Sequence, residues 1–148
     1  MISGRNRPSE QAEASYLADV ALGADFDDLL VAARDAEQAF RRAQAVAAPL
    51  AELYPLARKL DTALTDVMRA AYAAERAEIG PRGYDDRIYR RKAKAKPAVH
   101  AWADEAERLL TLRETHQLTG IPPRPRSVAP GTATSRAPGA ATSRAPAA

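Results

Sequence analysis

Residues 50–74 read LAELYPLARKLDTALTDVMRAAYAA, and this stretch decides the fold. Its apolar side chains recur at alternating spacings of three and four residues, which places them on one side of an α-helix. These positions are Leu50, Leu53, Ala57, Leu60, Leu64, Val67, Ala71 and Ala74. The spacing predicts a long helix with one apolar seam, which another helix must cover.

The residues before this stretch carry a second seam with the same alternation, out of phase with the first. Its positions are Leu29, Ala33, Ala36, Phe40, Ala43, Ala47 and Leu50. The alternation breaks near Pro49 and Pro55, and a proline inside a helix costs about 3 kcal/mol or more. Both signals predict a kink or turn at 48–55, between helical arms at about 26–48 and 56–79.

Two arms of nearly equal length about a short connector are typical of an antiparallel helical hairpin. We therefore predict an all-α protein with a coiled-coil-like, alanine-rich hairpin over about 26–79. The alternative is one long kinked helix that pairs with another chain. Alanine at many seam positions lets helices approach closely but buries little area, so either arrangement leaves apolar surface for a further partner.

The composition agrees with a slender helical protein. The 148 residues include 35 alanines, whereas Leu, Ile, Val and Phe together number 25, about 17% of the chain and below the roughly 20% typical of globular domains. A β-sandwich or a doubly wound α/β fold needs more β-branched and aromatic residues. The chain has no cysteine, which excludes disulfides and thiolate zinc sites.

Shorter helices are expected on both sides of the hairpin. Ser9 is a good N-cap for a helix over about 9–22, and Asp25 is the next cap. After Gly80 and Pro81 end the second arm, a short helix is expected over 84–95. The chain thus divides into a flexible segment 1–8, a helical domain 9–119 with a basic segment 82–96 and a C-terminal helix 97–119, and a tail 120–148.

The tail has a different texture from the rest of the chain. It is rich in proline, alanine and arginine, and residues 131–138 are echoed as a near-identical octapeptide at 139–146. Such a segment cannot bury enough apolar surface to offset the entropy of ordering, so we expect it to be disordered. Gly120 stands where the C-cap glycine of the preceding helix is expected.

Basic character is confined to one short internal segment and the tail. Residues 1–79 carry a net charge of −4, whereas residues 80–96 carry +5. The candidates for contact with an anionic partner are Arg82, Arg87, Arg90, Arg91, Lys92, Lys94 and Lys96. On a helix Arg87, Arg90, Arg91 and Lys94 share one face, which suits phosphate groups. The alternative is a solvated face that balances the acidic hairpin of the same chain.

Other side chains of this segment have expected roles. Tyr84, Ile88 and Ala95 lie on an adjacent flank, where we expect them to pack. Tyr84 and Tyr89 are also the aromatic side chains that could stack on bases. The apolar face is too small for binding to a membrane surface.

No catalytic motif or metal-ligand pattern is present. His100 and His116 lie sixteen residues apart, without carboxylates at metal-ligand spacing. His116 is expected near a helix C-terminus, in a capping or surface role. We therefore predict no catalysis, no cofactor, no metal site and no small-molecule substrate; a small helical enzyme is the least favoured alternative.

The hypothesis that follows is a non-catalytic interaction or adaptor protein, which self-associates or docks on a larger assembly and uses its basic segment as an auxiliary contact. The alternative is a dedicated DNA- or RNA-binding accessory protein. Candidates for the protein interface are Leu29, Phe40, Leu50, Leu60, Leu64, Val67 and Trp102. The lack of cysteine and of an apolar N-terminal run favours a cytoplasmic location.

Overall fold

The fold is all-α, as the sequence predicts. A computed structural model describes residues 7–126, and this part of the chain contains helices and no strand. The helices are α1 (Glu10–Ala24), α2 (Phe26–Ala45), α3 (Leu50–Ile79), α4 (Arg82–Asp85), α5 (Arg87–Ala93) and α6 (Pro97–Thr115), followed by a π-helical turn, η1 (His116–Gly120). Within the described residues no helix is both long and apolar enough to cross a membrane.

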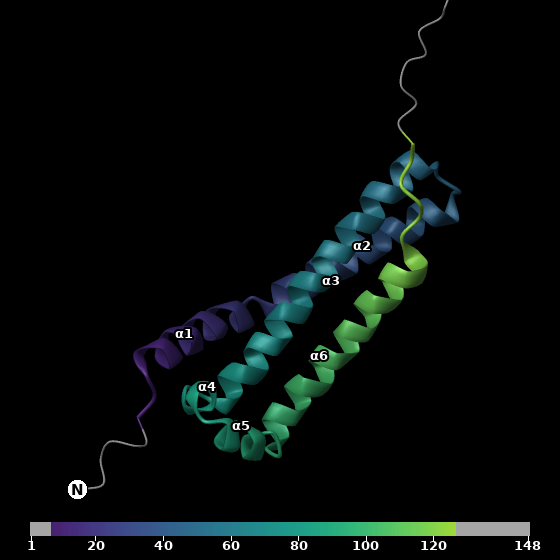
Figure 1. Cartoon of the computed structure of the whole chain (residues 1–148). Coiled ribbons are helices and arrows are strands. Elements are labelled where there is room, and N and C mark those ends of the chain that lie inside the picture. Colours follow the sequence, from purple (N-terminus) through teal and green to yellow (C-terminus); the bar gives the residue numbers. More distant parts are fainter. Residues whose placement is uncertain (1–6, 127–148) are drawn as a thin grey trace, which may run out of the picture.

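The 30-residue helix α3 is the axis of the bundle. Helices α1, α2 and α6 each pack along it, whereas the backbones of α2 and α6 approach each other at few points. Figure 1 shows α1 and α2 following one another along one side of α3, and α6 running beside α3 toward the turn that joins α2 and α3. Both α2 and α6 run antiparallel to α3.

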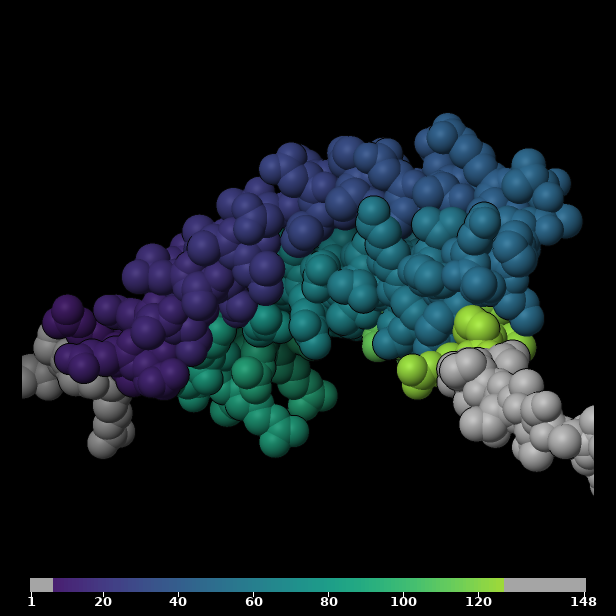
Figure 2. All heavy atoms as spheres, turned by 90° about the horizontal axis from the view of Figure 1, so that it is seen from above, coloured from purple at the N-terminus to yellow at the C-terminus, as the bar shows by residue number. Residues whose placement is uncertain are grey.

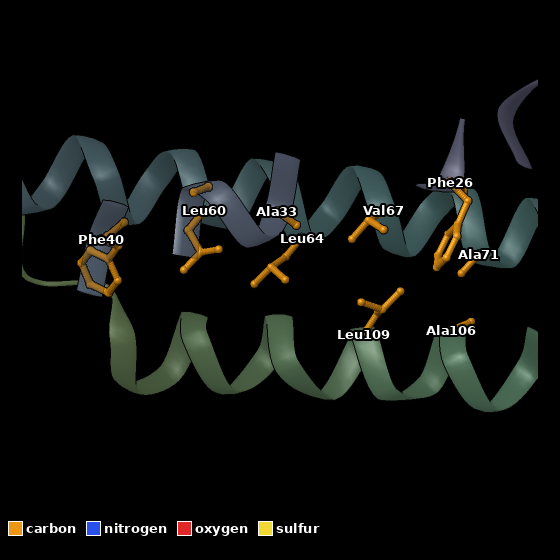
Figure 3. Close-up of a cluster of buried hydrophobic side chains, with 12 residues drawn as sticks. Phe26, Ala33, Phe40, Leu60, Leu64, Val67, Ala71, Ala106 and Leu109 are labelled. Atoms are coloured by element: carbon orange, nitrogen blue, oxygen red, sulfur yellow. The ribbon is translucent and has the colours of Figure 1, made fainter. Parts of the chain in front are cut away.

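The core lies where α2 and α6 meet α3. Phe26 and Phe40 anchor the two ends of α2, and Leu60, Leu64 and Val67 of α3 lie between them. Figure 3 shows Ala106 and Leu109 of α6 pointing toward this layer. The two predicted seams therefore meet inside the chain, together with a third apolar stripe from α6.

The turn between α2 and α3 is shorter than predicted. It comprises residues 46–49, and α3 begins at Leu50, so the prediction that Pro55 belongs to the turn was wrong. Pro55 removes one hydrogen bond from the second turn of α3. It is tolerated because Pro55 and Ala51, whose carbonyl loses the bond, are both exposed to water.

Helix α6 is a full member of the bundle and not a flanking element. Ala106 and Leu109 are almost completely buried against α3. A polar cluster joins α3 to α6 and η1: Arg113 of α6 donates to Thr65 (2.7 Å), and Gln117 of η1 donates to Asp61 (2.9 Å). The seam of α3, which was expected to leave apolar surface for an outside partner, is covered by α6.

Helix α1 packs on the C-terminal half of α3 through small side chains. Ser9 caps it as predicted, since its hydroxyl accepts a hydrogen bond from the backbone N–H of Ala12. A Cβ on Gly23 would lie only 3.2 Å from Ala74, so glycine allows the close approach. Asp25 occupies the N-cap position of α2, as predicted, but its side chain makes no capping hydrogen bond.

The end of the helical region also differs from the prediction. Residues 116–120 form a π-helical turn, and Gly120 has no positive φ, whereas Gly80 at the end of α3 does (φ +95°). Ile121, which we assigned to the tail, packs against the core. Residues 1–6 and the octapeptide repeat lie outside the described residues.

The packing of α6 can be tested with two leucines on the same helix. Leu109 is 1% exposed and Leu112 is 45% exposed. We expect Leu109→Ala to lower the free energy of unfolding by about 2–5 kcal/mol, because it leaves a cavity between α3 and α6. The control Leu112→Ala should cost less than about 1 kcal/mol. Urea unfolding measures both, and equal effects would contradict the position of α6.

Candidate anionic-partner interface

The basic segment forms the end of the molecule where α3 stops. Gly80 and Pro81 turn the chain into α4, and Asp86 separates α4 from α5. The backbone of Asp86 is extended, and its carboxylate accepts a hydrogen bond (2.8 Å) from the N–H of Tyr89, which caps α5. The prediction of a single helix over 84–95 was therefore wrong, because Asp86 starts a new one.

Helix α5 is held on the bundle by one narrow side. Ala93 is buried with Ile79 and Val99, and Tyr89 packs against this cluster. The guanidinium carbon of Arg82 lies 4.6 Å from the centre of the Tyr89 ring, and the Lys96 ammonium lies 5.8 Å from it. Tyr89 is thus engaged within the chain, in contrast to the expected role in stacking on bases.

The opposite side of α5 is exposed and positively charged. Arg87, Arg90, Arg91 and Lys94, which were predicted to share a face, are all exposed, as are Lys92 and Lys96. Tyr89 and Ala93 occupy the buried side, so the predicted face points away from the bundle. Figure 2 shows this region, in green, projecting beside α1 at one end of the molecule, with the residues just before 127 at the other end.

The acidic side chains of residues 7–126 do not neutralise the exposed cations of this end. Among the described residues, none of the six exposed cations forms an ion pair with an acidic side chain. The two acids of the segment are occupied elsewhere, since Asp85 accepts from Ser9 and Asp86 pairs with Arg82 at 3.2 Å. Arg82 differs from the other six cations because it pairs with Asp86 and lies over the Tyr89 ring.

Ile88 does not pack as expected. Its side chain is 69% exposed and stands among the cations of α5. Ala95 is exposed as well, whereas Tyr84 is half-buried and turned toward α1. Tyr84, Ile88 and Ala95 therefore do not form the packed apolar flank that was predicted for the basic segment.

A polar cluster fixes the basic end to α1. Asp19 of α1 accepts two hydrogen bonds from Arg76 of α3 (2.7 and 2.9 Å) and one from the hydroxyl of Tyr84 in α4. Burial alone would raise the pKa of Asp19, but these hydrogen bonds outweigh it and hold the pKa below its ordinary value of 3.8. Burial and the neighbouring carboxylate raise the pKa of the Tyr84 hydroxyl.

This cluster makes part of the stability depend on pH. Because the pKa of Asp19 is lower in the folded chain than in the unfolded chain, its ionised form stabilises the fold above pH 3.8, and this contribution is lost as the pH falls through the folded pKa. We expect Asp19→Asn to lower the urea midpoint at neutral pH and the deficit to shrink in acid. A difference in urea midpoint that does not change with pH would contradict the claim that ionised Asp19 stabilises the fold. Asp35→Asn, which removes an exposed carboxylate, serves as the control.

The predicted protein-interface residues are mostly covered within the chain. Phe40, Leu60, Leu64 and Val67 are buried in the core. Leu29 and Trp102 are partly buried against it, and the Trp102 ring meets Phe26 edge to face at 5.0 Å. Of this set, Leu50 at the start of α3 has the most exposed side chain, at 47%.

The two histidines have different surroundings. His100 is exposed and lies 2.9 Å from Asp104. His116 is the C-cap residue of α6, as its expected place near a helix C-terminus implies, but its side chain is buried and not at the surface. Its Nε2 lies 2.8 Å from the Ala57 carbonyl oxygen, and its ring meets Phe40 edge to face. Three or more acidic, histidine or cysteine side chains arranged to hold a metal ion are not found among residues 7–126.

His116 lines an open cleft between α2 and the end of α6. The cleft has a volume of about 300 Å³, and its wall includes Glu37, Arg41 and Gln44 of α2. Glu37 and Arg41 pair with each other at 2.6 Å. The position of His116 depends on Gly120, because a Cβ there would lie 2.3 Å from His116 Nδ1. The hydrogen bond to Ala57 and the contact with Phe40 explain why this histidine is buried as part of the core.

Comparison of the chain with protein-family models, with curated proteins and with solved structures finds no match.

Proposed function

We propose that this chain is a non-catalytic helical binding module whose basic end contacts an anionic partner. The basic end is formed by Arg87, Arg90, Arg91, Lys92, Lys94 and Lys96. The observation that carries the proposal is that all six are exposed, with no ion pair to an acidic side chain in the described residues. Like charges crowded on a short helix repel one another, so an anionic partner lowers their free energy.

The packing of α5 supports the same function. Tyr89 and Ala93 pack α5 on the bundle, and the Asp19 cluster joins the adjoining α4 to α1. Four of the six cations are therefore presented on a helix that is already folded, which reduces the entropy that a partner must overcome on binding.

The alternative of internal charge balance has less support. It requires ion pairs between the basic segment and the acids of α1, α2 or α3. Within the described residues, Arg82 is the one cation of the segment that pairs with an acid, and that acid, Asp86, belongs to the segment itself.

The bundle serves as the scaffold in this proposal. Helices α2 and α3 are joined by a four-residue connector, and their apolar seams pack against each other. This packing supports the proposal that the two helices form a coiled-coil-like hairpin. Because α6 covers the remaining seam of α3, the proposal does not use self-association through Phe40, Leu60 or Val67. Docking on a larger assembly then depends on the basic end.

The proposal is tested by nuclear magnetic resonance on the full chain labelled with nitrogen-15. Two chemically different polyanions, a short DNA duplex and polyglutamate, are titrated separately. We expect at least one of them to shift the backbone amides of 86–96 most strongly. The combined variant Arg87→Ala, Arg90→Ala, Arg91→Ala and Lys94→Ala should lose these shifts, because the cations that hold the partner are gone.

A charge-matched variant provides the control. Arg34→Ala, Arg41→Ala, Arg42→Ala and Lys59→Ala remove four exposed cations from α2 and α3. This variant has the same net charge as the α5 variant and should bind like the unchanged chain. If neither polyanion shifts the amides of 86–96, or if both variants bind equally, the proposal is wrong.

A further inference from the structure

We infer that the anionic partner is a double-stranded nucleic acid, which the basic end grips by the phosphate backbone without reading the base sequence. This inference rests on the proposed function and names the partner class for the same surface. Three observations support it: the density of the cations, the positions of the aromatic side chains, and the absence of certain uncharged polar residues from the segment.

The density of charge on the basic end matches a duplex better than an acidic polypeptide. Helix α5 carries four exposed cations in seven residues, about 10.5 Å of helix at 1.5 Å per residue, and Lys94 and Lys96 follow in the next three residues. Duplex DNA presents one negative charge per about 1.7 Å of its axis, or about six over the length of α5. An extended chain made only of acidic residues offers about three at about 3.3 Å per residue. Of these two partners, only the duplex offers at least as many anionic groups as α5 has cations.

The aromatic side chains favour a duplex over a single strand. Proteins that bind single strands stack exposed bases on aromatic rings. Here the Tyr89 ring lies under Arg82 and Lys96, the Tyr84 hydroxyl is bonded to Asp19, and the Trp102 ring packs against Phe26. The basic end thus presents cations without a free aromatic surface beside them.

The residue types of the segment favour contact with the backbone over reading of the bases. Residues 82–96 contain no Asn, Gln, Ser or Thr, so the side chains that read adenine edges are missing, and the Arg and Lys side chains that remain bind phosphates as well as guanine edges. Arg and Lys point outward from α5, and guanidinium groups form paired hydrogen bonds with phosphate oxygens. We therefore expect affinity with little sequence preference.

A lipid surface is the less suitable anionic partner. Helices that lie in a membrane interface bury an apolar face of several large side chains. On α5, Ile88 is the one large apolar side chain that is exposed, and the helix has seven residues.

The test compares four fluorescent or labelled probes with the full chain under the same buffer. They are a DNA duplex of about 20 base pairs, a single strand of equal length, polyglutamate of comparable charge, and vesicles rich in phosphatidylserine. We expect the duplex to bind at least about tenfold more tightly than each of the others, and two duplexes of unrelated sequence to agree within about threefold.

The salt dependence identifies the groups involved. The slope of log affinity against log salt concentration, measured between about 50 and 200 mM, changes by about 0.9 for each phosphate contact. The combined Arg87→Ala, Arg90→Ala, Arg91→Ala and Lys94→Ala variant should lower the slope by up to about 3.6, and the charge-matched α2–α3 variant should leave it within about one unit. An unchanged slope in the α5 variant would overturn the inference.

The outcomes separate this inference from the proposed function. If polyglutamate, the single strand or the vesicles bind as tightly as the duplex, and the α5 variant loses that binding, the duplex inference is wrong while the proposed function stands. A preference of more than about 100-fold for one duplex sequence overturns the claim of backbone contact. If no probe binds, both are wrong.

Discussion

The structure depends on the close packing of small side chains along α3. Ala57, Ala70, Ala71 and Ala73 are completely buried, so neighbouring helices approach the backbone of α3 without large side chains between them. One helix can therefore be packed by α1, α2 and α6 along its length. The low content of large apolar residues is compensated by close approach, in which many small van der Waals contacts add up.

The internal closure of the bundle determines which surface is left for a partner. With the α3 seam covered by α2 and α6, the most concentrated unbalanced feature of residues 7–126 is the cationic side of α5. Its position at the end of α3 is fixed by Tyr89 and Ala93 beneath it. One set of residues thus packs the middle of the molecule, and a different set supplies the positive charge at its end.

The sequence predicted the features that repeat at short range and missed those that depend on distant contacts. The spacing of the seams located α2 and α3, and the cations Arg87, Arg90, Arg91 and Lys94, which were predicted to share a face, are all exposed. The bond from Tyr84 to Asp19 joins residues 65 apart, and the burial of His116 depends on Ala57, 59 residues away. No local pattern carries such information. The position of Pro55 was predicted wrongly for the same reason, because its exposure to water, which makes a proline in α3 tolerable, depends on the tertiary structure.

The central claim is that the chain covers its own α3 seam, and sedimentation equilibrium of the full chain tests it most directly. Over a roughly hundredfold range of concentration, the account predicts a monomer of 15.9 kDa. A dimer that persists at the lowest concentration, and that dissociates only when the helices unfold, would show that another chain covers the seam and would contradict the account.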